Sequence, residues 1–261
     1  MFSFVLKPQA EVDQTWSIAR VAQEFPPWSW EELFSDAMPE IENASQIIER
    51  YEKQGERFFP LKQDTFAAFK YTPLNEVKVV IVGQDPYPSE IVWTDPMKPG
   101  SDSQYLPQAT GLSFSIRRGD SLPPTLNNIY KELQSSIKGW SPPNHGDLTP
   151  WSKQGVLLLN TVPTFQAGRQ KDNAKVFGPV WAGFIKKVLK TICTSNPACI
   201  FVLWGKNAQG IRQFIADTCP VLESSHPSPL SARYGFFGCN HFNQINEILI
   251  KQKRDPIDWS L

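Results

Sequence analysis

VKVVIVGQDPY (residues 77–87) is an apolar run that breaks at Gly83 and ends in an aspartate, a proline and a tyrosine. A short run rich in valine, without polar alternation, is typical of a parallel strand that is buried on both faces of a sheet. Asp85 and Tyr87 follow directly, where open α/β sheets bind their ligands. The stretch therefore predicts an α/β fold with a functional site at the carboxyl end of this strand.

Three further apolar runs of strand length follow, and segments with helical periodicity separate them. The predicted strands are residues 77–82, 155–160, 199–204 and, more weakly, 220–225. The predicted helices are residues 29–38, 44–55, 64–71, 126–137, 179–192, 207–218 and 241–252. This alternation predicts a three-layer α/β/α fold with a central, short, parallel four-stranded sheet.

We expect one domain over residues 1–261, with residues 1–28 as an N-terminal lead-in and residues 89–110 as a loop insertion. The insertion carries three prolines and a glycine, and it shows little periodicity. It comes directly after the Asp85 turn. Long loops inside compact domains are uncommon and often functional, although a solvated insertion explains the same pattern.

Composition limits the kinds of partner. Lysine plus arginine and aspartate plus glutamate each number 26, so no global positive field attracts nucleic acid, and any such contact needs a local patch. The four cysteines form no C-x-x-C pair and have no metal-like spacing with the three histidines, so we expect reduced thiols and no structural zinc. No apolar run is long enough to span a membrane, and the N-terminus lacks signal-peptide features. We expect a cytoplasmic bacterial protein, or a nuclear one if the source is eukaryotic or viral.

Four residues outside the opening stretch are candidates for a site, and each also has a structural explanation. His226 lies in the proline-stiffened loop HPSPLS (226–231), although a lone loop histidine is usually a solvated surface group. Asn160 ends an apolar strand, where its amide either anchors a loop or reads the edge of a base. Phe114 is either a core residue or a ring that stacks on a ligand. Leu230 is either incidental or a wedge at the tip of a rigid loop.

Together the motifs resemble family 1 uracil-DNA glycosylases, in that family's order, from about residue 29 to the C-terminus. The matching segments are GQDPY (83–87), GLSFS (111–115), LPPTLNNIYKEL (122–133), LLLN (157–160), WG (204–205), HPSPLS…GFFGC (226–239) and PIDWSL (256–261). Any one of them alone is a weak signal.

The resemblance implies an enzyme that flips deoxyuridine out of single- or double-stranded DNA and hydrolyses its N-glycosidic bond. Free uracil is released and an abasic site remains, which is the first step of base excision repair. The resemblance implies a monofunctional enzyme that needs no metal and no organic cofactor. A uracil-DNA glycosylase inhibitor protein is an implied partner, and we expect a monomer.

The resemblance also assigns roles to residues of this chain. Asp85 would stabilise the sugar cation and orient water, and a neutral His226 would donate to uracil O2. The implied substrate-binding residues are Gln84, Tyr87, Phe114 and Asn160. The implied DNA contacts are Thr125, Gly205, Lys206, Ser228, Leu230, Ser231, Arg233 and Tyr234.

Some positions depart from the family pattern. Pro88 stands where most members have histidine, Lys206 replaces a serine, and Arg233 and Tyr234 stand in reversed order. A relaxed mismatch glycosylase and a catalytically inactive DNA-binding scaffold are the alternative readings. A nucleotide-binding Rossmann protein is disfavoured, because no glycine-rich phosphate loop follows any predicted strand.

Overall fold

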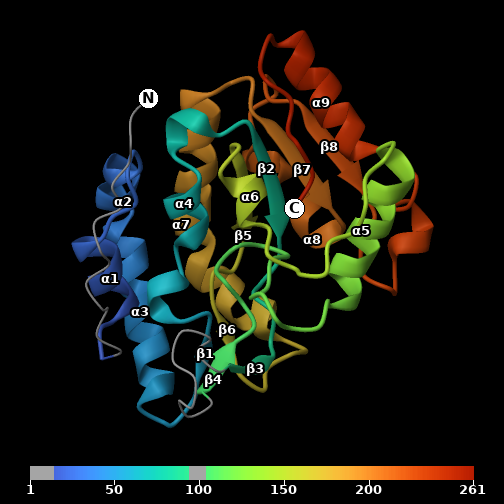
Figure 1. Ribbon diagram of the computed structural model, residues 1–261. Coiled ribbons are helices and arrows are strands. Elements are labelled where there is room, and N and C mark those ends of the chain that lie inside the picture. Colours follow the sequence, from blue (N-terminus) through green and yellow to red (C-terminus); the bar gives the residue numbers. More distant parts are fainter. Residues whose placement is uncertain (1–14, 94–103) are drawn as a thin grey trace, which may run out of the picture.

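A four-stranded parallel sheet lies at the centre of the protein (Figure 1). The computed structural model describes residues 15–93 and 104–261. The sheet consists of β2 (Val79–Gly83), β5 (Val156–Asn160), β7 (Ile200–Trp204) and β8 (Val221–Ser224), in the order β5-β2-β7-β8. Every residue of β2, β5 and β7 is buried, as the continuous apolar runs predict. The predicted sheet is confirmed.

Helices cover both faces of this sheet. Figure 1 shows α3, α4 and α7 on one side, and α5 and α9 on the other. The bounds are α1 (Ile18–Glu24), α2 (Glu31–Asp36), α3 (Met38–Glu52), α4 (Ala67–Tyr71), α5 (Pro124–Ser136), α6 (Thr149–Ser152), α7 (Asn173–Ser195), α8 (Lys206–Gln209) and α9 (His241–Lys251). The three-layer α/β/α architecture is therefore confirmed. No helix in residues 15–93 and 104–261 is both long and apolar enough to cross a membrane.

One continuous apolar cluster joins the helical layers to the sheet. Trp151 and Trp181 are among its fully buried side chains, and Trp259 near the C-terminus is 2% exposed. The backbone carbonyl of Trp259 accepts hydrogen bonds from the indole nitrogens of Trp140 (2.9 Å) and Trp151 (3.1 Å). The C-terminal segment is thus held inside the core.

Several helix predictions are wrong in extent, and α3, for example, begins at Met38 and not at residue 44. α7 begins at Asn173, not at Pro179, because buried Phe177 holds its first turns in the core and the proline is accommodated inside the helix. The predicted helix over residues 207–218 is reduced to α8 and a 3₁₀ turn at Arg212–Phe214. Gly210 lies between the two pieces, and glycine disfavours the continuation of a helix.

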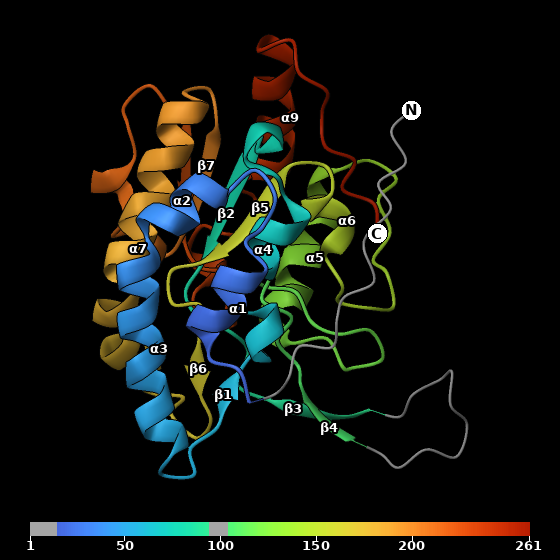
Figure 2. The same ribbon diagram turned by 90° about the vertical axis from the view of Figure 1, so that its left-hand side faces the viewer.

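The predicted loop over residues 89–110 is also wrong at both of its ends. Antiparallel strands β3 (Glu90–Trp93) and β4 (Gln104–Pro107) pair there, and residues 94–103 lie outside the described residues. Figure 2 shows this hairpin extending away from the body of the protein. Four-residue strands between proline-rich segments are too short to produce a clear periodic signal. A second small sheet, β1 (Phe58–Phe59) with β6 (Phe165–Gln166), was likewise not predicted.

The N-terminal lead-in contains structure as well. α1 lies within residues 1–28 and buries Ile18, Val21 and Ala22 in the core. From Ile18 onward the lead-in is therefore part of the fold.

Candidate active site

Four parallel strands bring the candidate residues to one edge of the sheet. Asp85 follows β2, Asn160 ends β5, Gly205 follows β7 and His226 follows β8. Because the strands are parallel, their carboxyl ends meet at this edge. Residues that lie more than a hundred positions apart in the sequence thus converge on one site.

Gly83 allows the strand ends to approach closely. A Cβ at this position would overlap Asn160 Oδ1 and would lie 2.7 Å from Ser113 Cβ. Ser113 fixes the segment 111–115 to the sheet, because its hydroxyl donates to the Ile81 carbonyl (3.2 Å) and its amide donates to the Leu158 carbonyl (3.0 Å). Glycine is therefore required at the first position of the GQDPY motif, because any side chain there would collide with Asn160 and Ser113.

The Asp85 carboxylate is held by two amides. Oδ2 accepts a hydrogen bond from Asn173 Nδ2 (3.0 Å), and Oδ1 accepts one from Gln84 Nε2 (3.3 Å). Burial raises the pKa of Asp85 above its ordinary value, and the two hydrogen bonds oppose this shift without cancelling it. The group is a desolvated carboxylate in a fixed orientation.

Asn173 is a residue that sequence reasoning missed. It is the first residue of α7 and is 1% exposed. Its Oδ1 accepts from the amide of Gln166 (2.9 Å), and its Nδ2 also donates to the Thr164 carbonyl (3.0 Å). These hydrogen bonds fix the orientation of the Asn173 side-chain amide, so that Nδ2 points toward Asp85. No sequence signal marked it, because the predicted helix begins at Pro179 and Asn173 lies before it.

The backbone fixes the tautomer of His226. Nδ1 accepts a hydrogen bond from the Ser228 amide (3.0 Å), so in the neutral ring the proton is assigned to Nε2. Burial lowers the pKa of His226, which favours the neutral imidazole at pH 7. Gly205 is needed beside it, because a Cβ there would lie 2.7 Å from His226 Cβ. The site therefore presents a neutral imidazole that can donate from Nε2.

Phe114 has a strained backbone. Its φ of 63° lies in the left-handed region, which costs a non-glycine residue about 1–2 kcal/mol and is often found at functional sites. The ring centroid lies 5.6 Å from that of Trp204 and 6.1 Å from that of His226. The Phe114 ring is thus held next to the candidate proton donor.

Tyr87 and Asn160 present polar groups that are not used inside the protein. Asn160 is 6% exposed, and its side-chain amide has no hydrogen-bond partner among residues 15–93 and 104–261. The Tyr87 ring is partly exposed, whereas its hydroxyl is buried, likewise without a partner in the described parts of the chain. Burial raises the pKa of Tyr87, so the phenol stays neutral. An unused buried amide is costly unless a ligand satisfies it.

The loop after β8 presents an exposed leucine on a rigid base. Leu230 is 87% exposed. The hydroxyls of Ser228 and Ser231 lie 2.9 Å apart, and Ser231 donates to the His226 carbonyl (2.8 Å). Asn128 Nδ2 on α5 donates to the Pro227 carbonyl (2.8 Å). The two serines therefore stiffen the loop that also carries the imidazole.

The other predicted DNA contacts lie around the same edge. Lys206 is exposed at the start of α8, and Thr125 is in the first turn of α5. Arg233 and Tyr234 are both exposed and bind each other, with Arg233 Nη2 donating to Tyr234 Oη at 2.6 Å. The reversed order of these two residues thus still leaves a joined cation and phenol beside Leu230.

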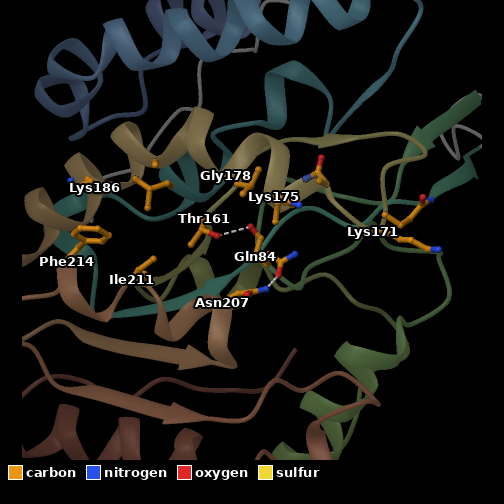
Figure 3. Close-up of a pocket in the computed structure, with 15 residues that line it drawn as sticks. Gln84, Thr161, Lys171, Lys175, Gly178, Lys186, Asn207, Ile211 and Phe214 are labelled. Carbon is orange, nitrogen blue, oxygen red and sulfur yellow. Dashed lines mark hydrogen bonds between the residues drawn. The ribbon is translucent and has the colours of Figure 1, made fainter.

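A cavity of about 610 Å³ adjoins this site (Figure 3). Gln84, Asn173 and Asn207 line it, whereas Asp85 and His226 do not. The cavity therefore neighbours the candidate chemistry but does not enclose it. Within the described residues, no three His, Cys, Asp or Glu side chains form a group that could hold a metal ion.

The family model of the uracil DNA glycosylase superfamily matches residues 69–250. The chain belongs to this superfamily. The matched range contains Asp85, Asn160 and His226, together with all four strands of the central sheet.

Curated and solved uracil-DNA glycosylases are similar over nearly the whole chain. The uracil-DNA glycosylase of Blochmanniella floridana is 38% identical over 239 residues, which is 90% of this chain and 100% of the relative. That of Klebsiella pneumoniae is 41% identical over 236 residues, with 89% and 95% covered. The crystal structure of mimivirus uracil-DNA glycosylase is 26% identical, with a TM-score of 0.81, and covers 95% of this chain and 91% of that one. A substituted mimivirus form in complex with UGI gives a TM-score of 0.80 at 27% identity, with 92% and 91% covered.

Proposed function

We propose that this chain flips deoxyuridine out of DNA and hydrolyses its N-glycosidic bond, releasing uracil and leaving an abasic site. Flipping is required because the bond cannot be reached inside the base stack. One observation carries the proposal: a partly buried carboxylate and a neutral imidazole with a free Nε2 lie at the same sheet edge as the unused Asn160 amide. Membership of the superfamily supports the reaction class.

Asp85 acts on the sugar side of the bond. Cleavage develops positive charge on the deoxyribose, which an oriented and desolvated carboxylate stabilises more strongly than water does. The same carboxylate orients the attacking water. Asn173 and Gln84 hold both oxygens in place, so little reorganisation is needed during the reaction.

His226 acts on the base side. Negative charge develops on uracil O2, and the Nε2–H of the neutral ring donates a hydrogen bond to it. Donors of this kind contribute about 10²–10³ in rate. The Ser228 amide on Nδ1 keeps the proton on the nitrogen that the reaction uses.

Three side chains select uracil. Phe114 stacks on the base, the Asn160 amide pairs with its Watson–Crick edge, and Tyr87 occupies the space that the C5 methyl of thymine needs. Affinity for one methyl group is worth only about 1–3 kcal/mol, so exclusion of thymine depends on a steric barrier. Gln84 adds polar contacts to the base.

The exposed loop residues bind the DNA. Leu230 enters the duplex as a wedge, and the loss of stacking costs a few kcal/mol, which phosphate contacts offset. Those contacts come from the segment that follows Leu230, from Lys206 and from the start of α5.

Two finer assignments follow from the relatives. Because the mimivirus structure is in complex with UGI, we propose that this chain also binds a uracil-DNA glycosylase inhibitor protein. The bacterial relatives support a cytoplasmic setting. An inactive DNA-binding scaffold is disfavoured, because such a protein has no need for a desolvated carboxylate and a neutral imidazole at the same edge of the sheet.

The test is uracil release from single- and double-stranded DNA that carries one deoxyuridine. A G·T mismatch serves as the substrate control, and each reaction is run with and without a chelator. We expect uracil release from both forms, no thymine release and no effect of the chelator. Intact uracil-containing DNA after prolonged incubation would refute the proposed function, and thymine release would favour the relaxed mismatch enzyme.

A further inference from the structure

The cavity beside Gln84 lies between α7 and the segment that follows β7, and we call it the α7 groove. Gln84 connects this groove to the chemistry, because its Nε2 donates to Asp85 Oδ1 at 3.3 Å. Asn207 Nδ2 donates to Gln84 Oε1 from the other side of the groove. Gln84 is therefore shared by the groove and the candidate active site.

Positive charge lies along the whole groove. Figure 3 shows Lys171 at one end and Lys186 at the other, with Gln84 between them. Lys171, Lys175 and Lys186 line the groove, and no aspartate or glutamate does. None of these three lysines forms an ion pair within residues 15–93 and 104–261. In a chain of net charge zero, this segregation of charge points to an anionic ligand.

The spacing of the lysines fits an extended ligand. Lys175 and Lys186 are eleven residues apart on α7, or about three turns, so they share one helix face and lie about 16 Å apart along the axis. Along a strand that keeps the stacked rise of ~3.4 Å per nucleotide, that distance spans about five nucleotides. Gly178 and Ala182 lie between them on this face, so no large side chain fills the groove there. The groove therefore suits a chain of phosphates better than a single small anion.

An aromatic ring ends the groove on the Lys186 side. Phe214 is 38% exposed, and Lys186 Nζ lies 4.9 Å from its ring centroid. Basic grooves with exposed aromatic rings are the usual means of binding single-stranded nucleic acid, because phosphates contact the cations and bases stack on the rings.

We propose that the α7 groove binds the single-stranded DNA that flanks the flipped deoxyuridine. Lys175 and Lys186 contact phosphates, and Phe214 stacks on a base. The inference rests on the proposed function, and it adds a DNA contact outside the loops at the strand ends.

The first test compares substrates of different length. Single strands with one deoxyuridine are extended on the 5′ or the 3′ side, and kcat/KM is measured for wild type, Lys175→Gln/Lys186→Gln and the control Lys251→Gln. Lys251 is an exposed lysine at the end of α9, next to Gln252, which binds the Ala198 carbonyl before β7. It thus lies at the opposite edge of the sheet. We expect kcat/KM of wild type and control to rise as one flank grows to about five nucleotides, and most of this gain to be lost in the double variant.

The second test measures binding without catalysis. Anisotropy with uracil-free single strands over a salt series gives the slope of log K against log salt. Each phosphate contact to a single strand contributes about 0.7 to that slope, so the double variant should lose about 1.4. Phe214→Leu should weaken binding about fivefold or more at constant slope, because it removes stacking and no charge.

These measurements test the proposed glycosylase activity and the proposed DNA binding by the α7 groove separately. If wild type releases no uracil, the proposed function fails, whereas the anisotropy series still decides the groove. Equal affinities and salt slopes in wild type and the double variant would overturn the groove proposal. Weakened binding of UGI with unchanged DNA binding would assign the groove to a protein partner and would overturn it too.

Discussion

At the residue scale, the site depends on how the partly buried carboxylate of Asp85 is held in one orientation. Desolvation raises the pKa of Asp85, and the hydrogen bonds from Asn173 and Gln84 partly lower it again. For catalysis Asp85 must be ionised and His226 neutral. Burial lowers the pKa of His226, which widens the pH range in which it is neutral, and protonation of Asp85, whose pKa is raised, contributes to the acid limb of activity.

The hydrogen bond from Asn173 to Asp85 predicts the effect of removing the Asn173 amide. Asn173→Ala removes a hydrogen bond that lowers the pKa of Asp85, so the acid limb of kcat/KM should move to higher pH. Activity at neutral pH should fall about tenfold or more, as expected when a hydrogen bond to a charged group is lost. Asn173→Asp should shift the limb further, since it adds a like charge. Thermal unfolding of both variants controls for damage to the fold.

The pH profiles of the Asn173 variants show whether Asn173 positions Asp85 or only supports the local structure. If kcat/KM falls equally at every pH and the acid limb stays in place, Asn173 only supports the fold around Gln166 and Thr164.

At the element scale, the loop over residues 226–231 carries two side chains with different proposed roles. It carries the imidazole at one end and the exposed Leu230 at the other, and hydrogen bonds from Ser231 and Asn128 stiffen it. A wedge is needed only when a base must leave a duplex stack.

Leu230→Ala should therefore affect duplex DNA more than single strands. We expect kcat/KM on double-stranded uracil DNA to fall by about tenfold or more, corresponding to part of the few kcal/mol for unstacking, with a smaller loss on single strands. Tyr105 in β4, which is 72% exposed on the hairpin, offers a control position for loss of an exposed apolar side chain. Equal losses on both substrates would contradict the wedge.

The elements also show what the sequence could predict. Strands β2, β5 and β7 were predicted because each is a continuous apolar run buried on both faces, whereas β8, with the sequence VLES, gave a weaker signal. The β3–β4 hairpin and the early start of α7 were not predicted. In both places tertiary packing or cross-strand pairing outweighs local signals such as Pro107 and Pro179. Motifs located Asp85 and His226, whereas the importance of Asn173 is visible only once α7 is seen beside β2.

At the scale of the whole molecule, we infer that the chain folds as one domain. The apolar cluster contains residues from Ile18 to Trp259 and from β2, β5 and β7, and partly buried Val221 and Leu222 of β8 pack against it. The two termini of the described chain thus contribute to one core.

One cooperative transition is therefore expected. Circular dichroism and tryptophan fluorescence should report the same unfolding midpoint, and Trp259→Ala should lower the free energy of unfolding by about 3–5 kcal/mol in both signals. Trp28 is 55% exposed, and its replacement by alanine should cost less. Two separate transitions, with only one affected by Trp259→Ala, would show that the chain divides into domains.

The central claim is that Asp85 and a neutral His226 act on the two sides of one glycosidic bond. Single-turnover uracil release by Asp85→Asn and His226→Ala tests it most directly, with binding of the same DNA measured in parallel. Asp217→Asn is the control, because that carboxylate is fully exposed. We predict that each active-site variant loses about 10²–10³ in rate or more while it still binds DNA, and that the control matches wild type. A near-wild-type rate in either active-site variant would contradict the account.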